Sequence, residues 1–256
     1  MKILLSNDDG FDSFGITTLA KELRKKHQVT IFAPHKNKSA SSSSLTLTTS
    51  IKSFKVAENI FKIEGTPSDC VHIGLRGFFD FEFDMVVTGT NFGANMGDDV
   101  IYSGTVAGAI EARFLGIPAI AFSLAVDIMT PHNSHKAEEH NFITAAKIAA
   151  KIIDNIDKIK IAKGTILNVN VPNIEYEKIQ GMQTTRLGKR HMSSKIRVCD
   201  KNDNHYFLGE NGLEDDNSLG TDFYAINNNF VSITPLHIDL TKYSEMDATS
   251  QFLKNL

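Results

Sequence analysis

The sequence predicts an α/β fold in which a doubly wound, mostly parallel sheet is followed by a C-terminal extension of short strands and a terminal helix. Three observations support this prediction. Short apolar runs bounded by turn residues recur along the first two thirds of the chain, segments of helical periodicity separate them, and the pattern becomes less regular after Pro172. Apolar runs that alternate with helices are typical of parallel strands covered on both faces.

Composition and charge are those of an ordinary globular protein. The 256 residues are 41% hydrophobic and 22% charged, which excludes disordered and collagen-like chains. A net charge of −3 gives no general basic field, so no stable nucleic-acid partner is expected. The first apolar run is too short for a signal peptide, no run is long enough to span a membrane, and the two cysteines suggest no disulfide framework. We therefore expect a cytoplasmic protein without a membrane partner.

The first predicted unit is a strand, a helix and a second strand. The first strand covers residues 2–5, and apolar side chains at helical spacing predict a helix over residues 16–26. The second strand covers residues 28–33 and stops at Pro34. A right-handed crossover makes the two strands parallel. Their carboxyl ends therefore lie at one edge of the sheet, which is where ligands bind in such folds.

Two adjacent carboxylates, Asp8 and Asp9, follow the first strand. In a partly dry cleft they would repel each other unless one is protonated or a cation lies between them. We favour the cation. The alternative is structural, an Asx-type turn in which Asp9 caps the following helix.

A serine-rich loop at residues 35–44 is predicted to open on the same edge of the sheet. Such a run is typical of a flexible linker, although one of its hydroxyls could complete a metal shell. Alternating apolar and polar residues then predict short accessory strands at 45–49, 51–56 and 60–63. Thr66 is expected to cap a helix that continues to Leu75.

A second polar loop follows the strand predicted at residues 84–89. In this loop Asn91 and Asn95 offer amide oxygens to a cation or N–H donors to an anion. Its glycines let the backbone approach a ligand closely. Because this is another loop at the same edge of the sheet, its position favours a ligand site over an ordinary turn.

The helix after this loop is predicted to begin at small hydroxyl residues. Ser103 and Thr105 flank Gly104 at its start, where free N–H groups and the positive end of the helix suit a phosphate. The alternative is that Ser103 or Thr105 only caps the helix and that Gly104 allows close packing against the sheet. The sequence leaves both interpretations open.

The remaining elements complete the sheet and then the extension. We expect a strand at residues 119–124, a helix at 136–157 and a strand at 166–171 that is the last of the main sheet. The less regular part contains strands at 182–187, 196–198, 205–208 and 230–234, a solvated loop at 209–217, a short helix from Thr221 and an amphipathic helix at 246–256.

Common nucleotide-site motifs do not occur after the first strand. Neither G-x-G-x-x-G nor G-x-x-x-x-G-K-[ST] is found there, and the hydrolase motif G-x-S-x-G is missing from the sequence. The carboxylates after the first strand would repel a bare pyrophosphate. A metal ion resolves that conflict.

Several distinctive motifs run in order along nearly the whole chain. They are Ser-Asn-Asp-Asp-Gly at 6–10, Asn-Lys-Ser at 37–39, Ser-Leu-Thr-Leu-Thr at 44–48, Gly-Thr-Pro-Ser-Asp-Cys-Val-His at 65–72, Thr-Gly-Thr-Asn-Phe-Gly-Ala-Asn at 88–95, Gly-Asp-Asp-Val-Ile-Tyr-Ser-Gly-Thr-Val-Ala at 97–107, Asn-Val-Asn-Val-Pro at 168–172, Thr-Arg-Leu-Gly at 185–188 and Ser-Ile-Thr-Pro-Leu at 232–236. In this order the sequence resembles the SurE family of survival-protein nucleotidases.

The resemblance implies a Rossmann-like catalytic domain at residues 1–172 and an extension at residues 173–256 that takes part in oligomerisation, as a homodimer or homotetramer. It also implies a cytoplasmic metal-dependent 5′-nucleotidase. By position the catalytic residues would be Asp8, Asp9 and Asn91. The metal shell would be Asp8, Asp9, Ser39 and Asn91, and the phosphate contacts Asn95, Ser103, Gly104 and Thr105.

Two departures from the family pattern stand near these positions. Ser39 is followed by Ala40 where the family usually has glycine, and Thr90 precedes Asn91 where the family usually has isoleucine. Alanine tolerates positive φ less well than glycine, so the first departure bears on the path of the serine loop. Neither departure removes a ligand.

The expected reaction is metal-assisted hydrolysis of nucleoside 5′-monophosphates, and of 3′-monophosphates as a second substrate class. An all-oxygen shell favours one Mg²⁺ or Mn²⁺ ion per subunit over zinc. Two alternatives stay open. One is a non-catalytic nucleotide or metal sensor on the same fold. The other is a haloacid-dehalogenase-like phosphatase, which needs a D-x-D arrangement, whereas Asp8 and Asp9 are adjacent.

Overall fold

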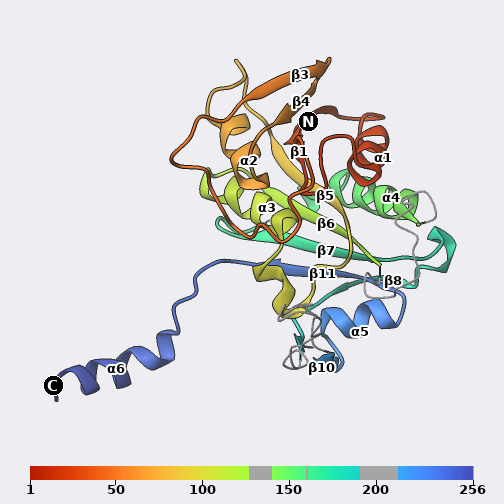
Figure 1. Ribbon diagram of the computed structural model, residues 1–256. Coiled ribbons are helices and arrows are strands. Elements are labelled where there is room, and N and C mark those ends of the chain that lie inside the picture. The colour runs from red at the N-terminus through yellow and green to blue at the C-terminus, as the bar shows by residue number, and fades with distance from the viewer. Residues whose placement is uncertain (127–139, 160, 191–212, 256) are drawn as a thin grey trace, which may run out of the picture.

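The computed structural model describes residues 1–126, 140–159, 161–190 and 213–255. Within these ranges the chain forms a nine-stranded sheet with helices on both faces (Figure 1). Across this sheet the strands lie in the order β3 (Ser53–Ala57), β4 (Ile60–Ile63), β2 (Gln28–Pro34), β1 (Lys2–Ser6), β5 (Met85–Phe92), β6 (Ala119–Ala125), β7 (Ile166–Pro172), β11 (Phe230–Leu236) and β8 (Gly181–Thr184).

The sheet is mostly parallel, as predicted. The run from β4 through β2, β1, β5 and β6 to β7 is parallel at every pairing. Antiparallel pairings occur where β3 joins β4 and where β11 joins β7. The carboxyl ends of β1 and β5 therefore lie side by side, with Ser6 opposite Thr88. This geometry places the loops after both strands at one edge.

The two faces of the sheet bury different side chains of the same strands. Ile3 and Leu5 belong to a core under α1 (Phe14–Leu23) and α4 (Phe142–Ile153), whereas Leu4 belongs to a core under α2 (Pro67–Leu75) and α3 (Gly104–Phe114). Figure 1 shows these helix pairs on opposite sides of the strands. A side-chain period of two on a strand buried on both faces produces this division. The fold is thus doubly wound.

The helix boundaries agree with local sequence signals, with two corrections. Helix α4, predicted at residues 136–157, ends at Ile153 because the chain after it turns into the 3₁₀ helix Ile156–Lys158, and the start predicted at Lys136 lies outside the described residues. The Thr66 hydroxyl accepts the backbone N–H of Asp69, and the Asp69 carboxylate accepts that of Thr66, so α2 begins with a capping box. Helix α1 ends at Leu23 and not at Lys26. The basic residues that follow continue as turns, so the charge run lies beyond the helix and not inside its last turn.

Two strand predictions were wrong. Residues 45–49 form no strand, because Thr46 donates its backbone N–H and its hydroxyl to the Asp69 carboxylate instead of to a strand. The strand at 166–171 is not the last of the main sheet, since β11 pairs with β7 and β8 pairs with β11. An apolar edge on β7 would otherwise stay open. The sheet therefore continues past Pro172, and the oligomerisation role of residues 173–256 stays a prediction.

The C-terminal part combines confirmed and corrected elements. Helix α5 (Asp222–Asn227) begins after Thr221, and α6 (Met246–Leu253) closes the chain. Part of the loop predicted at 209–217 forms β10 (Glu214–Asp216), which pairs with β9 (Lys189–Arg190) because opposite charges face each other across the strands. The strands predicted at 196–198 and 205–208 lie outside the described residues. Short 3₁₀ helices complete the described elements at Gly97–Ile101, Ile156–Lys158, Tyr176–Lys178 and Tyr243–Glu245.

Candidate active site

Asn7 shapes the turn that follows β1. Its amide N–H donates to the Gly10 carbonyl at 2.9 Å and to the Ser13 hydroxyl at 2.8 Å, and its carbonyl accepts the Gly10 N–H. Gly10 adopts a φ of 111°, which favours glycine. Helix α1 has Ser13 at its N-cap position without a side-chain cap. The structural alternative for Asp9 is therefore wrong, because Asn7 holds the turn and leaves both carboxylates for another role.

Asp8 lies at the carboxyl end of β1 and is 3% exposed. The Thr105 hydroxyl donates a short hydrogen bond to Asp8 Oδ1. Burial raises the pKa of Asp8, and this hydrogen bond together with the backbone N–H groups of Gly104 and Thr105 opposes the rise. The start of α3 thus lies directly against the first carboxylate.

Asp9 is less buried and has fewer donors. Its Oδ2 accepts the backbone N–H of Phe92 at 3.2 Å. Burial, and next the charge of Asp8, raise the pKa of Asp9 to about 7. The two carboxylates therefore resist being ionised together in the absence of positive charge.

Asn91 lies at the irregular carboxyl end of β5, next to Phe92, whose N–H donates to Asp9. The register with β6 shifts between Thr88 and Asn91, and such a bulge bends the strand and redirects its side chains. A Cβ at Gly89 would lie 2.1 Å from the Phe122 carbonyl oxygen, so glycine is required there. Asn91 Nδ2 donates to the Gly93 carbonyl at 2.9 Å. Its amide oxygen is the atom that remains for a cation.

The serine loop is fastened to both neighbouring elements and is not a free linker. The Lys38 N–H donates to the Asp8 carbonyl at 2.6 Å, and the Ser42 N–H donates to the Tyr102 carbonyl at 3.2 Å. Ser39, the predicted ligand, is exposed and its N–H donates to Asn37 Oδ1. Ser41, which the sequence did not single out, has a buried hydroxyl close to Gly104.

The predicted phosphate residues divide into two groups. Gly104 and Thr105 contact Asp8, as described above. Ser103 caps α3, because its hydroxyl accepts the Val106 N–H at 3.1 Å, and this agrees with the structural alternative for that residue. Asn95 is 6% exposed and donates to the Ser123 hydroxyl at 2.7 Å. The structure thus directs the Asn95 side chain toward β6.

Two asparagines of β7 also hold the backbone of Asn95. The side chains of Asn168 and Asn170 both donate to its carbonyl, at 2.8 and 3.0 Å, and its N–H donates to Asn170 Oδ1 at 2.8 Å. Alternating asparagines on a buried strand carry this signal in the sequence, since such amides need partners. They fix the backbone of the loop after β5.

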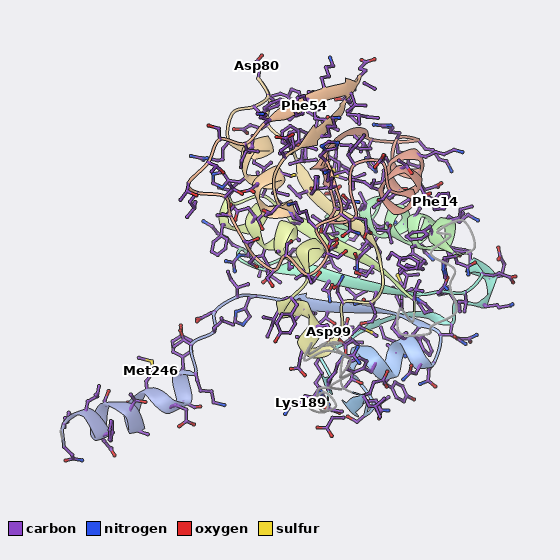
Figure 2. All side chains as sticks on the ribbon, viewed as in Figure 1. Phe14, Phe54, Asp80, Asp99, Lys189 and Met246 are labelled. Carbon is purple, nitrogen blue, oxygen red and sulfur yellow. The ribbon has the colours of Figure 1, made fainter. Side chains whose placement is uncertain are left out.

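The loop is held at its far end by the C-terminal part. The buried carboxylate of Asp222 accepts three backbone N–H groups, from Gly97, Gly188 and Phe223, at 2.8 to 2.9 Å. Arg190 adds an ion pair to Asp99 at 2.7 Å, and Figure 2 labels Asp99 near Lys189 at this junction. Residues far along the chain therefore position the loop that follows Asn91.

The donor atoms at this edge suit a hard divalent cation. One buried and one half-buried carboxylate, an amide oxygen and hydroxyls are the kinds of ligand that Mg²⁺ and Mn²⁺ prefer. In the described part of the chain no group of three or more His, Cys, Asp and Glu side chains is gathered for a metal. A cation between Asp8 and Asp9 would therefore take its further protein ligands from neutral oxygens.

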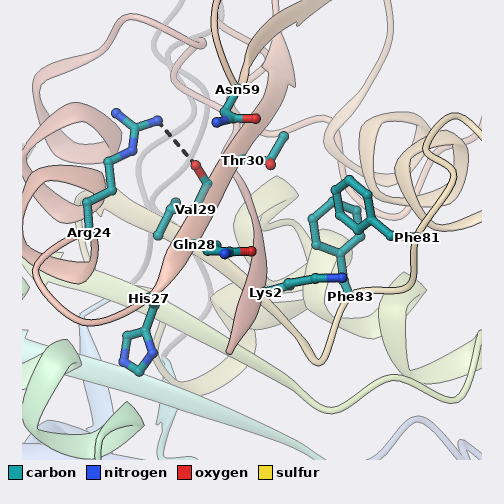
Figure 3. A pocket seen from close by; sticks show the side chains of 9 residues that line it. All are labelled: Lys2, Arg24, His27, Gln28, Val29, Thr30, Asn59, Phe81 and Phe83. Carbon is teal, nitrogen blue, oxygen red and sulfur yellow. Dashed lines mark hydrogen bonds between the residues drawn. The ribbon is translucent and has the colours of Figure 1, made fainter.

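A separate hollow of about 480 Å³ lies at the opposite, amino end of β1 and β2. Figure 3 shows that its cationic side chains do not converge on one point: Arg24 reaches the Val29 carbonyl, while Lys2 reaches toward Phe81. This hollow is far from the carboxyl ends of the strands. It is not a candidate for the site that contains Asp8 and Asp9.

The family model described as survival protein SurE matches residues 3–194. A protein of Ruthia magnifica named 5′-nucleotidase SurE is 53% identical over all of both chains, and one of Alkalilimnicola ehrlichii with the same name is 42% identical over all of this chain and 96% of its own. The crystal structure of the SurE protein from Aquifex aeolicus superposes with a TM-score of 0.85 at 38% identity, covering 98% of this chain and 99% of that one. No helix in the described ranges is long and apolar enough to cross a membrane.

Proposed function

The chain belongs to the survival protein SurE family, and from this premise we propose that it is a divalent-metal-dependent phosphomonoesterase. Its substrates are nucleoside 5′-monophosphates, with 3′-monophosphates as a second class, and its products are nucleoside and inorganic phosphate. This reaction is supported by relatives that match the full length of the chain and are named 5′-nucleotidase SurE. We place the enzyme in the cytoplasm on the basis of its cysteine usage.

One observation carries the metal part of this proposal. Asp8 and Asp9 are adjacent, both are withdrawn from water, and both have raised pKa values, that of Asp9 to about 7. No basic side chain is paired with either carboxylate among the described residues. A bound divalent cation would supply the missing positive charge.

The residues of the chain then have distinct tasks. Asp8 and Asp9, with the Asn91 amide oxygen and a hydroxyl of the serine loop such as Ser39, would hold the ion. The Thr105 hydroxyl orients Asp8. The bound ion supplies Lewis-acid activation of the phosphoryl group and of water. The positive end of α3 offsets charge that develops on the phosphoryl oxygens.

Phosphate release from a panel of nucleoside 5′- and 3′-monophosphates tests the proposal. The enzyme is first treated with chelator and then supplied with Mg²⁺, Mn²⁺ or Zn²⁺ in separate reactions. We expect no turnover after chelation and recovery with Mg²⁺ or Mn²⁺. Metal-dependent nucleotide binding without phosphate release would instead support a sensor, and full turnover in chelator would refute the metal dependence.

The C-terminal segment, residues 238–255, supports a homodimer or homotetramer. Figures 1 and 2 show its helix α6, which begins at Met246, standing away from the body of the molecule. The apolar side chains of the segment are exposed to an unusual degree, at 93% for Leu240, 67% for Tyr243 and 62% for Phe252. We propose that a second copy of the chain covers this segment. Light scattering on full-length protein and on a chain ending at His237 should show an oligomer only for the full-length form.

A further inference from the structure

Ser41 carries a hydroxyl that the ligand-free protein does not use. The Ser41 Oγ atom is inaccessible to water and has no hydrogen-bond partner among the described residues. A buried hydroxyl without a partner is costly, and in native structures such groups call for an explanation, such as an absent ion or ligand. A ligand that binds next to Ser41 Oγ would supply the missing hydrogen-bond partner.

The backbone around Ser41 is firmly held. The Ser41 N–H donates to the Lys38 carbonyl at 3.1 Å, and the Ser41 carbonyl accepts the Ser44 hydroxyl at 2.9 Å. Ala40 and Ser42, on either side, have φ values of 59° and 52°. Non-glycine residues adopt such values at a cost, and only where the surroundings enforce them. The backbone that carries Ser41 is therefore held in place by the loop.

The hydroxyl faces the start of α3 beside Asp8. A Cβ built on Gly104 would lie 3.0 Å from Ser41 Oγ, 3.0 Å from Asp8 Oδ2 and 2.8 Å from Asp8 Cβ. Glycine at position 104 thus keeps open a narrow gap between the serine loop, the carboxylate and the first turn of the helix. Any side chain there would close it.

The other groups around this gap are already engaged. Asp8 Oδ1 accepts the Thr105 hydroxyl, and the Ser103 hydroxyl accepts the Val106 N–H. Within the serine run, Ser39 and Ser43 are exposed. Ser41 is therefore the hydroxyl of the loop that is both buried and available, next to a helix N-terminus that favours anions.

We propose that Ser41 is a substrate-binding residue whose hydroxyl donates a hydrogen bond to a non-bridging oxygen of the phosphoryl group. This inference rests on the proposed phosphomonoesterase activity and adds to it a contact for the substrate. The hydrogen bond replaces the missing partner of Ser41 when phosphate is bound. No proton is transferred and no bond is formed or broken at Ser41.

The experiment compares wild type with Ser41→Ala, Ser41→Thr and Ser43→Ala. Calorimetry measures the affinity of each Mg²⁺-loaded protein for inorganic phosphate, kinetics measure kcat and KM for a nucleoside 5′-monophosphate, and thermal unfolding measures stability without ligand. Because hydrogen bonds to charged groups are strong, we expect Ser41→Ala to weaken phosphate binding and kcat/KM by about 10- to 100-fold. Ser41→Thr should keep most of both values, and Ser43→Ala should match wild type.

Stability separates a binding role from a structural one. Removal of an unpaired hydroxyl should leave the ligand-free Ser41→Ala protein at least as stable as wild type, whereas loss of a structural contact would lower its unfolding temperature. The proposal is overturned if Ser41→Ala binds phosphate as tightly as wild type does. It is also overturned if the substitution lowers the free energy of unfolding by as much as it lowers the free energy of phosphate binding. A wild type that binds phosphate but releases none from nucleotides refutes the enzyme function alone, because the calorimetric comparison still decides the role of Ser41. A wild type that neither binds phosphate nor releases it from nucleotides overturns both.

Discussion

Replacement of Asp9 by asparagine should make the metal-free protein more stable at neutral and alkaline pH. In the fold, burial and the charge of Asp8 raise the pKa of Asp9 from 3.8 to about 7. An unfolded chain ionises the same carboxyl near its ordinary pKa of about 4. Between these values the folded protein binds the additional proton, so the stability of the metal-free wild type falls as pH rises through this range and levels off above about pH 7.

The size of the effect follows from the same pKa values. At pH 8 the full shift would lower the free energy of unfolding of the metal-free wild type by about 4 kcal/mol. Asp9 is partly exposed, and solvent screening reduces this upper limit to about 2 kcal/mol. At a pH of about 4.5 roughly a quarter of the effect should remain. The asparagine side chain keeps the shape of the carboxyl but cannot ionise, so the variant does not lose stability as the pH rises.

Urea unfolding in chelator at about pH 4.5 and about pH 8 measures the difference between Asp9→Asn and wild type. Asp12→Asn, which changes an exposed carboxyl in the same turn, is the matched control and should show no gain. With excess Mg²⁺ at the higher pH the order should reverse, because ion binding stabilises wild type and not the variant. A variant that is less stable than wild type in chelator at the higher pH, or equally stabilised at both pH values, would refute the reasoning.

Three further substitutions test separate contacts. Asp8→Asn should leave a folded protein, judged by circular dichroism, whose turnover falls more than about 100-fold because a charged ligand becomes neutral; unchanged metal-dependent turnover would contradict the assignment. Gly104→Ala places a Cβ 2.8 Å from Asp8 Cβ. Urea unfolding should then show a loss of about 1–3 kcal/mol in the free energy of unfolding, and phosphate release should be reduced. Normal activity would show that the gap beside Gly104 is not needed. Asp222→Ala should cost about 3 kcal/mol in the same assay because three N–H groups lose their acceptor; a loss well below about 1 kcal/mol would mean that water replaces it. The N–H groups concerned belong to Gly97, Gly188 and Phe223.

Much of the sheet could be predicted because its signals are local. Apolar runs at residues 2–5, 28–33 and 119–124 became the buried strands β1, β2 and β6, and Thr66 capped α2 as expected. In these places the period of the side chains and the capping chemistry determine the structure within a few residues. The insertion of β11 beside β7 had no such signal, since strand pairing depends on partners distant in the sequence.

The candidate site shows the same division. That Asp8 and Asp9 end a buried parallel strand follows from the order of residues alone, and so does the place of Asn91 after the predicted strand at 84–89. The serine loop was ambiguous, because a run of similar hydroxyls does not indicate which one is buried. Its backbone bonds to Asp8 and Tyr102, and the positive φ of Ala40, select Ser41 as the buried hydroxyl and leave Ser39 exposed.

The order of residues was enough to predict the class of fold, the edge of the sheet at which the carboxylates lie, and a family resemblance that the comparisons confirmed. Three contacts became visible in the folded chain and not before: Thr105 binds Asp8, Asn168 and Asn170 hold Asn95, and Asp222 fastens the loop after β5. The reason is physical. Strand and helix patterns repeat within a few residues, whereas each of these hydrogen bonds joins groups at least 73 positions apart, which no local pattern specifies.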